Sequence, residues 1–170
     1  MDAAPWLVAV ARALQTVGLE AVLIGNAAAA LRGAPVTTVD LDFLFRPTPR
    51  NLQKLRALAD ALGAAVLRPY YPASDLFRVV RDDDGLQVDF MGTVHGLRSF
   101  EGVMDRSARM EFGGAALRVA ALSDVIRSKR AARRPRDLAV LPLLEQVHEA
   151  EEAGRARQPS RGARRPRARR

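Results

Sequence analysis

The chain has 170 residues, 48% of them hydrophobic, which is enough for one domain with a substantial core but too little for two. The absence of cysteine excludes disulfide bonds and thiolate metal sites, the apolar run over 21–31 is too short to span a bilayer, and no signal peptide opens the sequence, so we expect a cytoplasmic protein. The net charge is +8, but eight of the 27 basic residues are arginines of 154–170, so the other 19 balance the 19 acidic residues and the body is neutral.

The first half of the chain is predicted to alternate helices and strands. The elements expected from periodicity and capping residues are a helix over 2–17, a strand over 20–24, a helix over 27–32, a strand over 39–45 and a helix over 48–62. Gly25 and Asn26 form a tight turn between the first strand and the second helix. The N-terminus of that helix offers free backbone N–H groups to a phosphate, and Gly25 lets a phosphate approach the backbone closely.

Two acidic residues in the strand over 39–45 are the most informative feature of the sequence. Asp40 and Asp42 alternate with large apolar residues, which places both carboxylates on one face and the apolar side chains on the other. Asp is a poor strand former and like charges repel at this spacing, so the pair favours a bound cation over the alternative of two solvated acids. Paired carboxylates suit a hard divalent ion such as Mg²⁺.

A third acidic residue lies on a predicted hairpin. Strands over 76–81 and 86–91 flank a turn of three aspartates and a glycine, and Asp89 stands on the second strand. If this strand lies beside the strand of Asp40 and Asp42, three carboxylates converge, which is enough for two metal ions. The turn aspartates, Asp82, Asp83 and Asp84, are interpreted as a solvated turn and not as ligands.

The second half of the chain supplies scaffold. The expected elements are a hairpin over 109–112 and 115–119, a helix from its cap Ser123 to about 132, and a helix from Pro135 to about 153. His95 and His148 lack metal-ligand spacing, so we expect surface or packing roles. The fold class is therefore α/β (α+β), a small mixed β-sheet flanked by helices, with C-terminal helices and a disordered basic tail.

Several segments together resemble a known family, the DNA polymerase β-like nucleotidyltransferase superfamily. The residues that carry the resemblance are Ile24-Gly25-Asn26, Asp40-Leu41-Asp42-Phe43 and Val88-Asp89-Phe90. Three further stretches are similar to small bacterial nucleotidyltransferases, a group that includes abortive-infection toxins of toxin–antitoxin systems. They are the motif Thr38-x-Asp40-x-Asp42 and the segments 122–129 and 134–137. The resemblance spans about residues 20–145, and the acidic residues are its most specific part.

The resemblance implies a nucleotidyltransferase-like fold and an enzyme that moves a nucleoside monophosphate from an NTP to an acceptor hydroxyl, with two Mg²⁺ ions. The implied catalytic and metal-binding residues are Asp40, Asp42 and Asp89, and the implied nucleotide-binding residues are Gly25, Asn26, Thr38 and Lys129. Asp137 opens the last helix, where an acid favours the helix dipole whatever its function. The implied acceptors are a tRNA 3′ end, a protein hydroxyl or a small molecule, and the implied protein partner is an antitoxin.

Two positions depart from the family pattern. Asn26 stands where relatives have Gly or Ser, and Val36 stands where many have Arg. Asn can still donate an N–H to a phosphate, whereas the loss of Arg removes a bidentate phosphate contact. One alternative is therefore a catalytically weakened member that binds nucleotide or a partner protein.

The C-terminal end of the chain suggests a second boundary and another alternative. We expect one domain over 1–153 and a disordered Arg-rich tail over 154–170. The tail has no aromatic residue to stack on bases, so it is interpreted either as an arm that binds RNA or another polyanion through phosphates, or as a solvated extension. The remaining alternative function is nucleic-acid binding through this tail alone.

Overall fold

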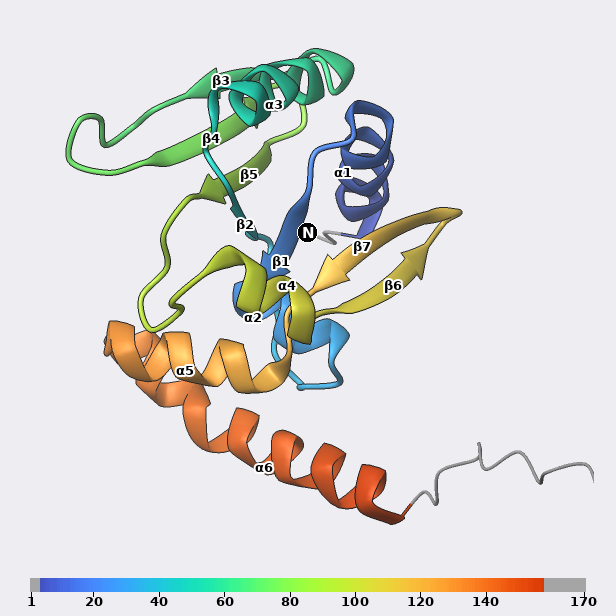
Figure 1. Ribbon diagram of the computed structural model, residues 1–170, viewed down its shortest axis with the longest axis vertical. Helices are drawn as coiled ribbons and strands as arrows, with labels where there is room; N and C mark the ends of the chain where they lie inside the picture. The colour runs from blue at the N-terminus through green and yellow to red at the C-terminus, as the bar shows by residue number, and fades with distance from the viewer. Residues whose placement is uncertain (1–3, 158–170) are drawn as a thin grey trace, which may run out of the picture.

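The computed structural model describes residues 4–157, which form a seven-stranded mixed sheet with helices on both faces (Figure 1). The strand order is β3-β4-β5-β2-β1-β7-β6. In chain order the elements are α1 (Ala4–Val17), β1 (Ala21–Ile24), α2 (Gly25–Leu31), β2 (Leu41–Phe45), α3 (Pro49–Ala61), β3 (Ala65–Leu67), β4 (Leu76–Arg81), β5 (Leu86–Met91), α4 (Phe100–Arg106), β6 (Ala108–Phe112), β7 (Ala115–Val119), α5 (Leu122–Ala132) and α6 (Pro135–Arg157). The predicted fold class, a mixed sheet flanked by helices with further helices at the C-terminal end, is confirmed.

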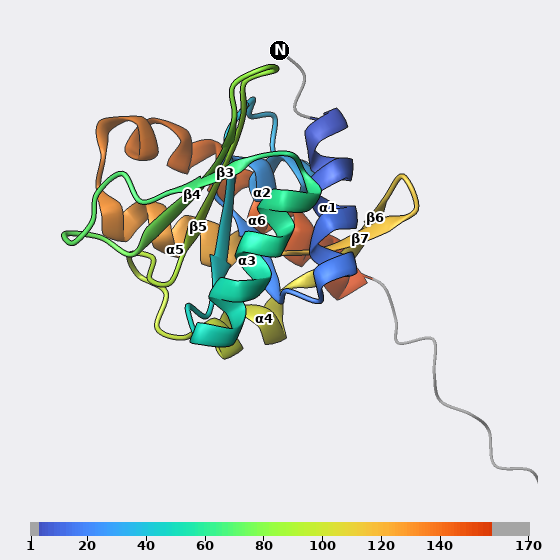
Figure 2. The ribbon, with the colours of Figure 1, turned by 90° about the horizontal axis from the view of Figure 1, so that it is seen from above.

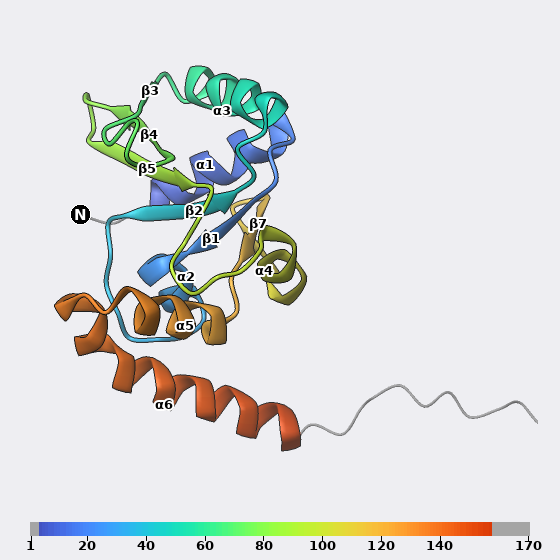
Figure 3. The ribbon, with the colours of Figure 1, turned by 60° about the vertical axis from the view of Figure 1, so that its left-hand side comes forward.

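The helices divide into two layers. Helices α1 and α3 cover one face of the sheet, while α2, α5 and α6 lie on the other side (Figures 2 and 3). On the α1 and α3 side the core contains three aromatic rings: Phe43 stacks on Phe90 with a centroid distance of 5.2 Å, and Phe45 meets Phe90 edge-on at 5.8 Å. All three side chains are fully buried. The apolar residues that alternate with the acids of β2 therefore anchor the strand in the core, as the sequence predicts.

The position of β2 in the sheet decides the geometry of the acids. Strand β2 lies between β1, to which it is antiparallel, and β5, to which it is parallel. Asp42 is in register with Asp89 of β5 on one side and with Ile24 of β1 on the other. Residues in register on neighbouring strands point to the same face. The predicted neighbourhood of the two acidic strands is thus confirmed.

Two predicted boundaries were wrong for identifiable reasons. Strand β2 begins at Leu41 and not at residue 39, because the Asp40 N–H donates to the Thr38 hydroxyl oxygen at 3.1 Å and is not paired with a neighbouring strand. Ser123 is not a helix cap. The N-cap of α5 is Ala121, because the backbone stays bonded to β1 through Ala120 and turns directly into the helix.

Other elements differ from expectation in their bounds, or were not predicted at all. The predicted turn at Gly25 and Asn26 is already the first turn of α2. Two elements were not predicted: the short edge strand β3, and the seven-residue helix α4, whose N-cap is Ser99. Helix α6 continues to Arg157, four residues beyond the predicted domain boundary. The rest of the predicted tail, residues 158–170, lies outside the described residues.

None of the helices within residues 4–157 combines the length and the apolar character needed to cross a membrane.

Candidate active site

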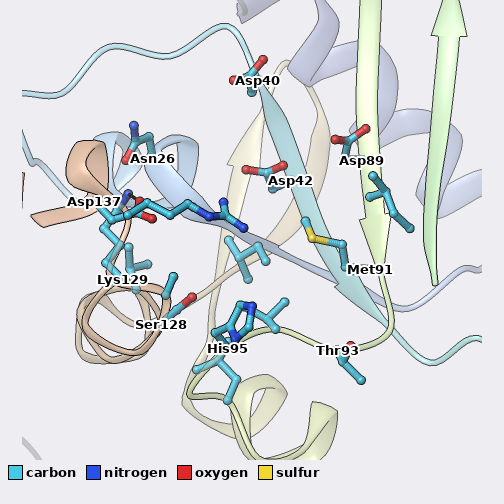
Figure 4. Close-up of a pocket in the computed structure, with 18 of the residues that line it drawn as sticks. Asn26, Asp40, Asp42, Asp89, Met91, Thr93, His95, Ser128, Lys129 and Asp137 are labelled. Carbon is cyan, nitrogen blue, oxygen red and sulfur yellow. Dashed lines mark hydrogen bonds and ion pairs between the residues drawn. The ribbon is translucent and has the colours of Figure 1, made fainter. Parts of the chain in front are cut away.

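A row of side chains crosses three strands on the face of the sheet opposite the phenylalanines. The row consists of Arg78 on β4, Asp89 on β5 and Asp42 on β2, each in register with the next. Figure 4 shows Asp42 and Asp89 side by side on neighbouring strands, with Asp40 at the start of β2. The sheet therefore brings the three predicted carboxylates to one place.

The charge of Asp42 is poorly compensated in this row. The pKa of Asp42 is raised to about 6, mainly by burial and then by the negative charges of Asp89 and Asp40. The positive charges of Arg136 and Lys129 act in the opposite direction without cancelling these effects. No Lys, Arg or His within the described part of the chain forms an ion pair with Asp40 or Asp42, so both carboxylates are open to a cation from solution.

Asp89 has a different environment from its neighbour. The Arg78 guanidinium donates two hydrogen bonds to Asp89, one to each carboxylate oxygen, both at 2.7 Å. The two side chains are largely shielded from solvent, with 25% of Arg78 and 15% of Asp89 exposed. Bidentate ion pairs of this kind are strong and fix the orientation of the carboxylate.

Gly25 is required by the close approach of the backbone to Asp42. Its φ of +67° lies in the left-handed region, and a Cβ atom at this position would lie 2.7 Å from Asp42 Oδ2. A side chain would therefore have to displace the carboxylate. The neighbouring Asn26 has a side-chain oxygen that is buried and has no hydrogen-bond partner among the described residues. Both residues line the site on the side of α2, where Figure 4 shows Asn26.

The opposite wall is formed by α5 and the start of α6. Lys129 Nζ donates to Asp137 Oδ1 at 2.9 Å, and both residues are buried. Two further cations, Arg134 and Arg136, line the same cleft, are exposed, and make no ion pair within residues 4–157. Lys129 is therefore committed to Asp137, whereas the two arginines keep their charge available.

These walls enclose an open cleft of about 780 Å³, a size that suits a small-molecule substrate. Its floor is the carboxylate row, and its lining also includes Thr38, Ser128 and the exposed His95. The cleft has acids on the sheet side and cations on the helix side. Such a division of charge suits a ligand that carries both phosphates and a metal ion.

Comparison with known proteins agrees with this geometry. The family described as "Nucleotidyl transferase of unknown function (DUF2204)" matches residues 4–157. The chain belongs to this family. No curated protein matches the sequence.

The nucleotidyltransferase fold is also shared with solved structures. The solution structure of the antibiotic-resistance factor ANT(2'')-Ia is 15% identical, with 87% of this chain and 90% of that chain covered and a TM-score of 0.56. The crystal structure of ANT(2'')-Ia in complex with adenylyl-2''-tobramycin is 18% identical, with coverages of 91% and 97% and a TM-score of 0.56. An antigenic nucleotidyltransferase-like protein from Paracoccidioides brasiliensis is 14% identical, with coverages of 88% and 85% and a TM-score of 0.51. At these identities the likeness establishes the fold alone.

In this DUF2204 nucleotidyltransferase the cleft brings together every residue predicted to be functional. They are Gly25, Asn26, Thr38, Asp40, Asp42, Asp89 and Lys129. Their individual roles remain predictions. The turn acids and one histidine lie elsewhere: Asp84 is paired with Arg81 at 2.7 Å, which lowers the pKa of Asp84, and His148 lines a separate groove between α5 and α6.

Sequence reasoning missed three arginines of the nucleotidyltransferase cleft, Arg78, Arg134 and Arg136. Arg78 could have been found, because a four-residue turn after Arg81 places residue 78 opposite residue 89 in the hairpin. Arg136 lies in a segment that the sequence singles out, but its proximity to Asp42 depends on how α6 docks.

Within the described residues, no three His, Cys, Asp or Glu side chains are arranged as a ready metal-binding group.

Proposed function

We propose that the protein is a Mg²⁺-dependent nucleotidyltransferase that moves a nucleoside monophosphate from an NTP to an acceptor hydroxyl. The observation that carries this proposal is the row of carboxylates on the floor of a cleft whose opposite wall is cationic. Membership in the nucleotidyltransferase family supports it.

The residues present fit a divalent metal ion. Asp40 and Asp42 are oxygen donors without an ion-pair partner in the described chain. The pKa of Asp42 is raised by burial and by the charges of Asp89 and Asp40, which Arg136 and Lys129 do not offset. The glycine at position 25 leaves room beside Asp42 Oδ2 that any side chain would fill. Asp40 and Asp42 would hold the metal. When bound, Mg²⁺ would neutralise charge on the triphosphate and lower the barrier to attack at phosphorus.

The remaining residues of the cleft would bind and orient the substrates. Arg134 and Arg136 are placed to bind phosphate oxygens, and the Asn26 side-chain amide can donate an N–H to one of them. Lys129 contributes its positive charge from a fixed position beside Asp137. Asp89 is oriented by Arg78 and can accept a hydrogen bond from the acceptor hydroxyl.

In the proposed reaction the acceptor oxygen attacks the α-phosphorus of the NTP. The bond from the α-phosphorus to the bridging oxygen breaks, and pyrophosphate leaves with the electron pair of that bond. The hydroxyl proton passes to a base, for which Asp89 is placed, and the nucleoside monophosphate remains on the acceptor.

Three classes of acceptor remain candidates. The adenylylated tobramycin bound to ANT(2'')-Ia suggests a small polyhydroxylated molecule. The Arg-rich C-terminal sequence favours RNA, such as a tRNA 3′ end, and the sequence resemblance to abortive-infection toxins suggests RNA or a protein hydroxyl, with an antitoxin as partner.

A second candidate function is nucleotide binding without turnover. Val36, at the position where many members of the resembled family carry Arg, packs against the hydrophobic core and offers no phosphate contact. This arrangement supports a weakened member of the family. The third possibility, nucleic-acid binding through the Arg-rich tail alone, depends on residues 154–170, most of which lie outside the described residues.

One experiment separates these candidates. The protein is incubated with each α-³²P-labelled NTP and Mg²⁺, in turn with total tRNA, cell lysate and a panel of aminoglycosides, and the products are resolved on gels and by thin-layer chromatography. Label on an acceptor, absent with Asp42→Asn, supports transfer and identifies the acceptor class. Saturable NTP binding without label transfer supports the weakened member, and absence of both contradicts a nucleotide function.

A further inference from the structure

We infer that Arg78 withholds Asp89 from the metal site, so that the protein binds its metal through Asp40 and Asp42 while Asp89 is kept for the acceptor hydroxyl. This inference rests on the proposed function and deepens it. Arg78 is therefore a positioning residue: it acts on the reaction through the orientation and charge of Asp89.

The first step of the argument is the place of Asp89 in the row. It lies in register between Arg78 on one side and Asp42 on the other, so its carboxylate has a cation and an anion as neighbours. The two bonds of 2.7 Å to Arg78 show that it is paired with the cation. Repulsion from Asp42 favours the same orientation.

The second step is the effect of this pairing on a metal ion. A guanidinium beside Asp89 repels a divalent cation, and it occupies one acceptor position on each oxygen of the carboxylate. The pair is largely shielded from solvent, with 15% of Asp89 exposed, so water does little to screen the repulsion.

The third step is the contrast with Asp40 and Asp42. Neither has an ion-pair partner in residues 4–157, and Gly25 keeps the space beside Asp42 open. The site thus holds two carboxylates that attract a metal, Asp40 and Asp42, and one whose charge is already balanced, Asp89. Each oxygen of Asp89 keeps a lone pair after bonding to Arg78, so the oriented carboxylate can accept a hydrogen bond from an acceptor hydroxyl.

The test is Mn²⁺ binding in the absence of nucleotide, measured on the full chain from the electron paramagnetic resonance signal of free Mn²⁺. We expect Asp42→Asn to weaken Mn²⁺ binding by tenfold or more, since it removes a ligand. Asp89→Asn removes no ligand but leaves the Arg78 charge unpaired, so it is compared only in combination with Arg78→Met. Arg78→Met should strengthen Mn²⁺ binding on the order of tenfold, because Asp89 is then free to join the site. The double variant Arg78→Met/Asp89→Asn should return to the wild-type affinity.

Two control variants address structural effects. Arg81 and Asp84 form another bidentate pair at the end of the same hairpin, with bonds of 2.9 and 2.7 Å, so Arg81→Met should leave Mn²⁺ affinity unchanged. Arg78→Lys retains the charge without the bidentate geometry, and it should give an affinity between wild type and Arg78→Met. Melting temperatures of all variants show whether each is folded.

The outcomes distinguish this inference from the proposed function. If Arg78→Met/Asp89→Asn weakens Mn²⁺ binding as much as Asp42→Asn, or if Arg78→Met fails to strengthen it, the inference is overturned while the metal-dependent function stands. If wild type fails to bind Mn²⁺ but Arg78→Met binds it, the inference is overturned, because Asp40 and Asp42 then do not hold the metal in the unmodified protein. If no folded variant binds Mn²⁺, both are rejected.

Discussion

At the scale of single residues, the site concentrates negative charge that the fold does not neutralise. Asp42 is the extreme case, because burial and the carboxylates of Asp89 and Asp40 all disfavour its ionised form. A group that opposes the stability of the free protein can persist when it serves ligand binding, and a metal ion would relieve the repulsion. The raised pKa of Asp42 therefore links stability, pH and metal binding in one side chain.

The first prediction concerns the pH dependence of stability. The folded-state pKa of Asp42 is about 6, above the unfolded value of about 4, so the folded protein binds more protons between these values. The free energy of unfolding should therefore fall as pH rises from 4 to 6, and the full penalty is present at pH 7. Asp42→Asn should raise the free energy of unfolding at pH 7 by about 1–3 kcal/mol and flatten the profile between pH 4 and 6. Urea denaturation at several pH values without divalent metal checks this, and an unchanged profile would contradict it.

The second prediction concerns Gly25. Gly25→Ala places a Cβ 2.7 Å from Asp42 Oδ2 and forces alanine to a φ of +67°, so it should destabilise the fold and displace the carboxylate. Gly85→Ala is a matched control, because Gly85 has a φ of +72° and open space at its Cβ position. Both variants should lose about 1–2 kcal/mol from backbone strain, and Gly25→Ala should lose more and also bind Mn²⁺ more weakly. Equal stability losses and equal Mn²⁺ affinities would contradict the close approach.

At the scale of elements, the cationic wall depends on how α5 and α6 are joined. Lys129 near the end of α5 and Asp137 in the first turn of α6 form a buried pair at 2.9 Å. A buried pair contributes little by itself, but the loss of one partner leaves a buried charge without compensation. The pair thus fixes the start of α6, and with it the position of Arg136.

The third prediction tests this pair. Lys129→Met should reduce the free energy of unfolding by about 3–5 kcal/mol, and the double variant Lys129→Met/Asp137→Leu should recover most of the loss. Arg130 and Glu145 form an exposed pair between the same helices at 2.7 Å, so Arg130→Met should change stability by less than about 1 kcal/mol. Chemical denaturation of the four proteins supplies the comparison. A double variant no more stable than Lys129→Met would show that the pair itself stabilises the junction.

The elements also show what the sequence can and cannot predict. The hairpin of β4 and β5 was predicted with its observed bounds, because strand periodicity and the turn of aspartates and glycine agree locally. The pairing of β2 with β5 was stated only as a condition for convergence of the carboxylates, because the sequence gives no local signal for pairing between strands that are far apart in the chain. Edge strand β3 has only three residues, two of them exposed, and the seven-residue helix α4 contains a glycine, so neither gives a periodic signal.

In the candidate site, too, local sequence patterns were predictable and tertiary contacts were not. Asp40, Asp42 and Asp89 were recognised because acids are unusual between strand apolar residues. Lys129 was assigned to phosphate because its charge is visible in the sequence, whereas its burial against Asp137 depends on helix docking. Arg136 was missed for the same reason: its effect on Asp42 is a tertiary contact.

At the scale of the whole molecule, charge is distributed unevenly along the chain. The sequence over 158–170, which lies outside the described residues, carries six arginines and no acidic residue, so its removal lowers the net charge from +8 to +2. The cleft holds cations enough for a triphosphate but presents no extended basic face for a long polyanion among its lining residues. A nucleic-acid acceptor would therefore draw most of its electrostatic affinity from the C-terminal sequence.

The fourth prediction follows from this distribution and uses a truncation after Arg157, the last residue of α6. The truncated protein should keep its melting temperature, since the removed sequence is rich in Arg, Pro and Gly and has almost no apolar surface to bury. Its affinity for tRNA should fall steeply, and the slope of log K against log salt should flatten by up to about 4, because fewer counterions are released. Fluorescence anisotropy with labelled tRNA at several salt concentrations measures both quantities.

A full-length variant with the six arginines replaced by lysine should retain the slope, since it keeps the charge. Unchanged tRNA affinity and slope after truncation would show that these residues are a passive extension, and the case for an RNA acceptor over a small molecule or a protein hydroxyl would lose its electrostatic basis.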